Sequence, residues 1–591
     1  MSQSGNYIER RSFLKTGAAG VAGASTMLAG CAGGDGETPT DTEAETETEG
    51  EDTEVPTATE AEGEIQTGGE LTVALQSDPF TLHPHHYTDT SSSQLAANYG
   101  NRLVDVTPNG KLVPDLATEI PEPQEGGTKY VFQIEEGVQF HGDYGECKAQ
   151  DIVDIYHRIL STDYWGDLDE EKVQAPARAD YEGILVGEGL DRKETVQATG
   201  EYEITFKLSQ PYAPFLYKLT DGRMTAVPPE AIEEHGKDFG TVDNGVWATG
   251  PFKFVEGRAD DHYTFEKFDD YFKTDDNGNA LPYLDKTRWN IVPESSVRKT
   301  QIKTGNVDIS EVVPARDVKG LQDAEAVTIN SRPGSSLLSL YVNTRTFEPL
   351  AKKKMRKALA YGMSKQALVQ TKFNGFATPG WSIFPPWHWA YDDSVTKYKH
   401  DPQKAESLAQ EAGEAGLQFN CSPTNQPLFT DAATIMQQGY TNIGIDMEIT
   451  PKEKSAAWGP TIGAWDPKTF EPKDKVGPPS SYNSHVEDLT YGFNADGYSY
   501  ITFHTNAWLN VSYYSNDDVD GWLEDARKAT SREERKELYS KAQKQIMEDT
   551  PQIHGVWWNV NQAFRNNVQS FNTYPSFAID LETVWKGEAS A

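Results

Sequence analysis

Apolar and polar residues alternate at two early places in the chain. Residues 69–75, Gly-Glu-Leu-Thr-Val-Ala-Leu, show a period of two, and so do Tyr130, Phe132 and Ile134. From residue 149 the period becomes helical, because the apolar residues then fall on one face of a helix, at Ile152, Ile155, Ile159 and Leu160. These patterns predict a first strand at 69–75, a strand near 130–134 and a helix that starts near residue 149.

The C-terminal part carries another clear helix. Ser531 and Glu534 fit a capping box, Pro551 ends the run, and a buried stripe lies between them at Leu538, Ala542 and Ile546. The apolar residues 555–558 then predict a strand. Strands interleaved with helices indicate an α/β protein. Because 591 residues exceed one ordinary core, we expect two or three domains or lobes.

Residues 128–160 resemble the signature of a known family. An aromatic strand is followed by Gly137-Val138, Phe140-His141, Ala149, Asp151 and Arg158-Ile159-Leu160. This order is similar to that of the peptide and nickel class (family 5) of extracellular solute-binding proteins, which serve ABC importers. Further stretches match in the family's order, among them Thr249–Phe252, Phe268–Phe272, Pro282–Asp285, Lys303–Asp308, Val342–Thr344 and Met355–Tyr361.

The resemblance implies an α/β, two-lobed periplasmic-binding-protein-like fold (type II, large peptide-binding class) with an extra subdomain in the first lobe. The chain would cross between the lobes near residues 335 and 553. The expected divisions are a signal at 1–31, an acidic disordered tether at 32–67, lobe I at 68–335 with the extra subdomain at about 90–240, lobe II at 336–553, and a return to lobe I at 554–591.

The N-terminus resembles two export signals in succession. Arg10 and Arg11 precede Ser-Phe-Leu-Lys, as in a twin-arginine signal, and Leu28-Ala29-Gly30-Cys31 resembles a lipobox. Residues 16–30 between them fall short of the about 20 apolar residues that a spanning helix needs. We therefore expect an exported protein with lipid on Cys31, anchored to the outer face of the cytoplasmic membrane. The alternative is an ordinary N-terminal anchor with an accidental cysteine.

The chain is strongly acidic, with 91 Asp and Glu against 53 Lys and Arg and a net charge of −38. Residues 32–67 hold 13 acids and no base, and residues 1–31 carry +2, which leaves −27 on residues 68–591. Such a field makes nucleic acid and anionic lipid poor partners. It favours a halophilic, haloarchaeal source over an acidic mesophilic one.

Two other classes of activity are weighed against solute capture. Nucleophile-elbow, zincin and phosphate-loop motifs do not occur in the chain, so we expect neither an enzyme nor a cofactor. Residues 82–87, Leu-His-Pro-His-His-Tyr, follow the first strand, where such folds place ligand-contacting loops, and imidazoles suit nickel. His85 and Tyr87 are therefore ligand candidates, although Pro84 and the short spacing disfavour a preformed metal site. A His-Pro turn is the simpler alternative.

The favoured function is capture of di- or oligopeptides for the permease subunits of an ABC importer. In peptide-binding relatives an aspartate after an alanine in the second lobe receives the ligand's α-ammonium, and Ala495-Asp496 matches it in part. A solvated turn aspartate is the alternative. Further candidates are Trp381, Trp387 and Trp389, which line a pocket or cover the core. Oligosaccharides and nickel or metal chelates remain alternative solutes.

Two smaller features of the sequence stay open. Cys147 and Cys421 are either free or paired, and their spacing does not resemble a metal site. Asn420 and Asn510 begin sequons and are candidates for N-glycosylation.

Overall fold

The computed structural model describes residues 64–87, 89–160, 184–185, 192–454, 456–458, 482–505, 507 and 509–588. Two large hydrophobic cores organise these residues. One gathers side chains between positions 71 and 309 together with 564–584, and we call this half lobe I. The other gathers side chains between positions 337 and 557, and we call it lobe II. The export residues Arg10, Arg11 and Cys31 lie outside the described residues.

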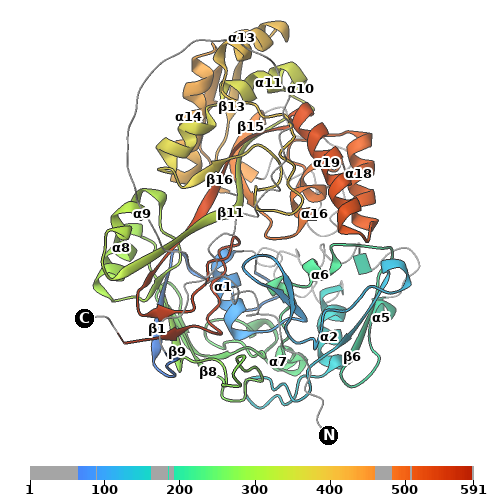
Figure 1. Ribbon diagram of the computed structural model, residues 1–591, viewed down its shortest axis with the longest axis vertical. Helices are drawn as coiled ribbons and strands as arrows, with labels where there is room; N and C mark the ends of the chain where they lie inside the picture. The colour runs from blue at the N-terminus through green and yellow to red at the C-terminus, as the bar shows by residue number, and fades with distance from the viewer. Residues whose placement is uncertain are drawn as a thin grey trace, which may run out of the picture.

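One 11-stranded sheet runs through both lobes (Figure 1). Its order is β14 (Asp446–Ile449), β13 (Gln418–Cys421), β15 (Ser484–Thr490), β11 (Val327–Val342), β16 (Gln552–Arg565), β10 (Ile309–Ser310), β1 (Glu70–Leu75), β9 (Lys286–Ile291), β8 (His262–Lys267) and β7 (Phe252–Arg258), with β12 (Ala377–Pro379) paired to β16. Three smaller sheets pair β4 (Lys129–Gln133) and β5 (Val196–Ala198) with β6 (Glu203–Lys207), β2 (Val104–Val106) with β3 (Leu112–Pro114), and β17 (Val568–Gln569) with β18 (Trp585–Lys586).

Helices pack on both lobes. Lobe I carries α1 (Thr90–Tyr99), α2 (Ala149–Leu160), α5 (Arg192–Thr195), α6 (Phe215–Lys218), α7 (Pro229–His235), α8 (Ser295–Thr304) and α9 (Ala315–Gln322). Lobe II carries α10 (Glu348–Ala351), α11 (Lys353–Gly362), α12 (Lys365–Ala367), α13 (Pro402–Glu411), α14 (Pro427–Thr441), α16 (Ala495–Tyr498), α17 (Tyr500–Phe503), α18 (Asp517–Lys528) and α19 (Arg532–Asp549).

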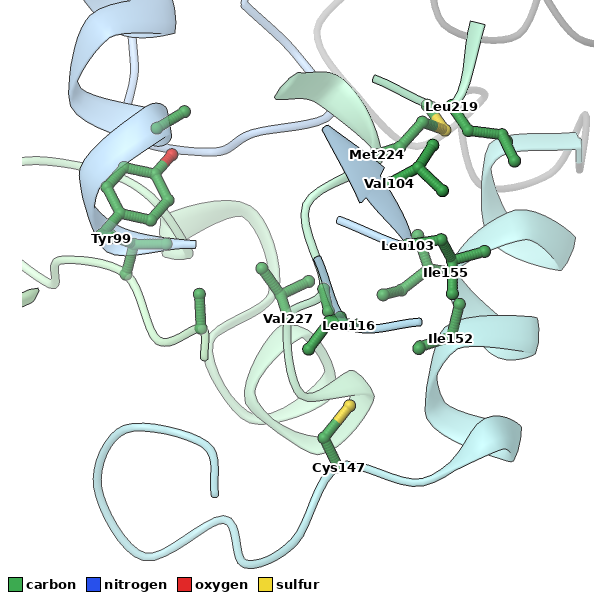
Figure 2. Packing of buried hydrophobic residues seen from close by; sticks show 14 of the residues in the cluster. Tyr99, Leu103, Val104, Leu116, Cys147, Ile152, Ile155, Leu219, Met224 and Val227 are labelled. Atoms are coloured by element: carbon green, nitrogen blue, oxygen red, sulfur yellow. The ribbon is translucent and has the colours of Figure 1, made fainter. Parts of the chain in front are cut away.

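The elements predicted from local periodicity are confirmed. Strand β1 covers the first alternating run, β4 the second, and α2 begins at Ala149. Ile152 and Ile155 of α2 point into the lobe I core (Figure 2). Helix α19 starts after Ser531, whose hydroxyl accepts from the Glu534 N–H over 3.1 Å, as expected for a helix cap.

The strand directions show which ends of the strands face the boundary between the two lobes. β11 and β16 are antiparallel and run between the lobes, since their paired residues belong to both cores. β10 is antiparallel to β16, and β1 and β9 are parallel to β10, so these lobe I strands point along β11 toward lobe II. β15 is antiparallel to β11, and β13 and β14 run with β15, so they point toward lobe I. The carboxyl ends of both parallel sets therefore meet at the boundary between the lobes.

The crossing strand β11 has an irregular segment near its middle. Its register with β16 shifts between Pro333 and Leu337. A Cβ at Gly334 would lie 2.7 Å from the Trp558 carbonyl oxygen, so only glycine fits this close approach. The carbonyl of Ser335 accepts from Tyr498 Oη over 3.4 Å, and the hydroxyl of Ser335 donates to the Pro575 carbonyl over 3.0 Å. Contacts from both lobes thus converge where the sheet changes lobes.

Both cysteines in the described part of the chain are free and buried. Cys147 lies in the lobe I core (Figure 2), and Cys421 lies in that of lobe II. Among the described helices, none combines the length and the apolar character that a membrane crossing requires.

Candidate functional site between the lobes

Two short segments of lobe I and lobe II touch at the boundary. Tyr212 Oη donates to Asp496 Oδ2 over 3.0 Å, and the Ala213 N–H donates to the Arg527 carbonyl over 2.7 Å. Tyr212 precedes α6, Asp496 lies in α16 and Arg527 in α18, and Figure 1 shows α16 above α6. The two lobes are therefore in contact at the side of the sheet where these short helices lie.

Asp496 is the centre of this contact. The Asn494 side chain caps α16 by accepting from the Asp496 N–H over 3.0 Å, which fixes the backbone there. The Asp496 side chain is only 1% exposed, so the alternative of a solvated turn aspartate is wrong. Its Oδ1 lies 3.2 Å from Arg527 Nε, but the angles do not make a hydrogen bond, and neither of these buried atoms has a hydrogen-bond partner among the described residues.

Arg527 is held by aromatic rings as well as by charge. Its guanidinium carbon lies 3.8 Å from the Tyr500 ring centroid and 4.9 Å from that of Tyr212. Burial disfavours the guanidinium charge, but the Asp496 carboxylate and the two tyrosines outweigh it and raise the pKa of Arg527. Burial and the same carboxylate raise the pKa of the Tyr212 hydroxyl. The Asp496 carboxylate thus lies between the charged Arg527 and the neutral Tyr212 hydroxyl, and its Oδ1 accepts no hydrogen bond from the described residues.

The three tryptophans predicted to line a pocket contact different parts of lobe II. Each is half-buried. Trp381 lies under the Lys365 ammonium at 5.4 Å, and Trp387 Nε1 donates to the Gly334 carbonyl over 3.2 Å. Trp389 packs against the guanidinium groups at the start of α19, those of Arg532 at 5.1 Å and Arg535 at 4.9 Å. Trp387 thus contacts the irregular segment of β11 and Trp389 contacts α19, and the His388 ring packs against both indoles.

The histidine-rich loop after β1 folds back into lobe I. His85 is fully buried, and its Nε2 lies 3.4 Å from the Thr225 carbonyl oxygen. Its ring packs edge-on against His83, and burial lowers the pKa of His85 to about 4. Tyr87 is also buried in the lobe I core. The structure does not bring either residue to Asp496. Within the described ranges, no group of three or more His, Cys, Asp or Glu side chains is arranged to hold a metal ion.

The two sequon asparagines differ in their surroundings. Asn420 is half-buried, and its Nδ2 donates to Thr450 Oγ1 over 3.0 Å. Asn510 is buried, and its Nδ2 donates to the His504 and Tyr514 carbonyls over 3.1 and 2.7 Å. Glycosylation at Asn510 would replace one Nδ2 hydrogen and so remove at least one of these bonds in the folded chain.

Sequence reasoning missed Tyr212 and Arg527. Tyr212 lies 284 residues from Asp496, and no local pattern marks it. It also missed Glu311, which directly follows β10 at the boundary, is fully buried, and accepts from the Gln76 N–H and from Gln94 Nε2 over 2.9 and 2.8 Å. A surface hollow of about 560 Å³ beside Tyr361 lies at the α11–α13 end of lobe II, away from this boundary (Figure 1).

Two lobes on one sheet, with the carboxyl ends of their parallel strands facing each other, define a two-lobed solute-binding protein. The model of the bacterial extracellular solute-binding proteins, family 5 (middle region), matches residues 111–518, and the chain belongs to this family.

Comparison with individual proteins agrees with this fold. The chain is 24% identical over 550 residues to the oligopeptide-binding protein AppA of Bacillus subtilis, covering 88% of this chain and 92% of AppA. It is 25% identical over 518 residues to the glutathione-binding protein GsiB of Escherichia coli K12, covering 87% and 94%. The periplasmic binding protein DppA of Helicobacter pylori, solved with the peptide STSA, superposes with a TM-score of 0.72 at 22% identity, covering 88% and 98%. The fold is accordingly the two-lobed type II fold of the peptide-binding class.

Proposed function

We propose that this protein captures peptides between its lobes outside the cell and delivers them to the permease of an ABC importer. The observation that carries the proposal is Asp496, a buried carboxylate at the lobe boundary with an oxygen that lacks a hydrogen-bond partner. The names of AppA and DppA, which refer to oligopeptide binding and to a bound peptide, support the same class of solute.

The chemistry of Asp496 suits a peptide's free α-ammonium. A closed boundary strips water from the ammonium, so the group needs a carboxylate partner. Asp496 Oδ1 would accept from it, while Tyr212 keeps its bond to Oδ2. The positive Arg527 beside Oδ1 would have to share the carboxylate or turn away. Ligand binding would then compete with the contact between Asp496 and Arg527, and this competition would lower the affinity for the peptide.

Hinge closure would convert ligand occupancy into a signal for the permease. β11 and β16 are long crossing strands, and the irregular segment at residues 334–336 is the natural place for bending. Tyr498, two residues after Asp496, donates to the Ser335 carbonyl and so links the proposed ligand anchor to this segment. In this proposal the importer hydrolyses ATP, Cys31 carries the lipid that holds the protein at the membrane, and no catalytic step occurs in this chain.

The solute can be identified directly. Native mass spectrometry of the purified protein should detect co-purified peptides, and calorimetry should detect binding of a free tripeptide in the absence of metal. An oligosaccharide or a nickel chelate bound in its place, with no peptide binding, would contradict the proposal.

A further inference from the structure

Glu487 and His485 project from the same face of β15, in the amino-terminal half of this strand in lobe II. Glu487 is 5% exposed and His485 is fully buried. Their facing atoms, Glu487 Oε2 and His485 Nε2, are 3.6 Å apart. Thr424, three residues after β13, and Trp458 approach the same carboxylate, so the cluster lies just beyond the carboxyl end of β13, beside the start of β15.

The hydrogen bonds fix which atoms carry protons. His485 Nδ1 lies 2.6 Å from the Ser422 carbonyl oxygen, which can only accept, so the proton of the neutral ring is on Nδ1. Burial lowers the pKa of His485 to about 4, so the ring is neutral at pH 7. Nε2 therefore presents a lone pair, and within the part of the chain that the structure describes this buried atom has no hydrogen-bond partner.

Glu487 is an acceptor in the same place. Its Oε2 accepts from Thr424 Oγ1 and, over 3.3 Å, from Trp458 Nε1. When Glu487 is ionised, a ring lone pair faces a carboxylate oxygen, and no group of the described residues donates to both, which is costly for buried groups. The Lys454 charge favours the ionised form of Glu487, but no ion pair joins the two side chains in the described part of the chain. The neighbouring Asp488 adds negative charge, and burial raises the pKa of Glu487 to about 7.

We propose that Glu487 and His485 form a subsite for a cationic side chain of the captured peptide, an ammonium or a guanidinium. A cationic group with two N–H donors, placed beside the pair, would donate to both Oε2 and Nε2. Trp458, whose ring lies 5.2 Å from that of His485, would supply an aromatic wall for the cation. This inference rests on the proposed function and adds to it a preference for peptides that contain lysine or arginine.

Calorimetry with matched tripeptides tests the subsite. The probes are Ala-Lys-Ala and Ala-norleucine-Ala, which differ in the charged group while keeping a similar apolar chain. The wild type should bind the lysine peptide about tenfold or more tightly. Glu487→Gln should reduce the difference to about threefold or less without lowering the melting temperature, because its amide N–H can donate to His485 Nε2. Glu448→Gln, at an exposed position of β14, removes the same charge and should keep the preference.

The failures of the two proposals are distinguishable. Equal binding of both tripeptides by the wild type would overturn the subsite and leave peptide capture intact. If neither peptide binds, peptide capture fails and the subsite with it. If Glu487→Gln changes only the pH dependence of unfolding and keeps the lysine preference, the pair holds a proton rather than a ligand, and the inference is overturned.

Discussion

Tyr212 of lobe I donates a hydrogen bond to Asp496 of lobe II over 3.0 Å, across the boundary between the two cores. The Ala213 N–H adds a backbone bond to the Arg527 carbonyl over 2.7 Å. A phenol that bonds a buried carboxylate in the other lobe stabilises the closed arrangement, because opening would exchange this hydrogen bond for water and leave only Arg527 beside the carboxylate. The residues proposed to bind ligand thus also hold the lobes together.

Tyr212→Phe should shift the ligand-free protein toward an open form. A hydrogen bond to a charged group contributes about 1.5–3 kcal/mol, enough to change the closed population several-fold. Small-angle X-ray scattering of the ligand-free variant should give a larger radius of gyration than the wild type. Tyr217→Phe is the matched control, since Tyr217 bonds the Gly110 carbonyl within lobe I. An unchanged radius for Tyr212→Phe would show that this bond does not hold the lobes.

Thermal stability should depend strongly on salt. Residues 68–591 carry −27, and their mutual repulsion grows as the Debye length rises from about 3 Å at 1 M to about 30 Å at 0.01 M. Scanning calorimetry across this range should show a melting temperature that falls steadily as salt is removed. A midpoint that stays constant would mean that the acidic surface does not destabilise the fold.

Lys365 should make stability rise with pH. Its ammonium is buried, donates to the His554 carbonyl and lies over Trp381, and burial lowers its pKa from 10.5 to about 7. Between these values the unfolded chain holds one more proton than the folded chain, so unfolding becomes costlier as pH rises from about 7 toward 10. Urea unfolding at pH 7 and pH 10 should show that Lys365→Met removes this part of the slope. The exposed Lys319→Met is the control, and equal slopes in both variants would disprove the effect.

Cys31→Ser should release the protein from the membrane. The expectation rests on Leu28-Ala29-Gly30-Cys31 and on the acidic segment 32–67 that follows. Membrane fractionation should show the variant in the soluble fraction, and its melting temperature should match that of the wild type because the side chains of the two described cores begin at residue 71. A variant that remains in the membrane fraction would contradict lipid attachment at this residue.

Local periodicity was sufficient to predict β1 and α2, because each buries one face whose spacing is visible in a few residues. The motif around Asp496 also lies within a few consecutive residues, so the sequence was sufficient to locate this residue of the lobe boundary. Tyr212 and Arg527 could not be predicted, because their place beside Asp496 depends on how distant segments fold and on how the lobes meet.

The loop after β1 is a case in which the sequence suggested a ligand contact that the structure does not place at the lobe boundary. Position in the sequence suggested ligand contact for His85. Instead its ring packs edge-on against His83, and both rings are buried in lobe I, while the half-buried His86 stacks on His83 at 3.7 Å. Neutral imidazoles are apolar enough to be packed in this way. Residue type and strand order therefore could not decide between a ligand loop and a core-forming turn.

Calorimetry on Asp496→Asn tests the central claim most directly. The wild type should bind a free-amine peptide, and the variant should bind it at least about tenfold more weakly, because truncating one member of a buried charged pair costs about 2–5 kcal/mol. An N-acetylated peptide of the same sequence should bind both proteins with similar affinity. If both peptides are affected alike, or if the wild type binds neither, Asp496 is not the amine anchor.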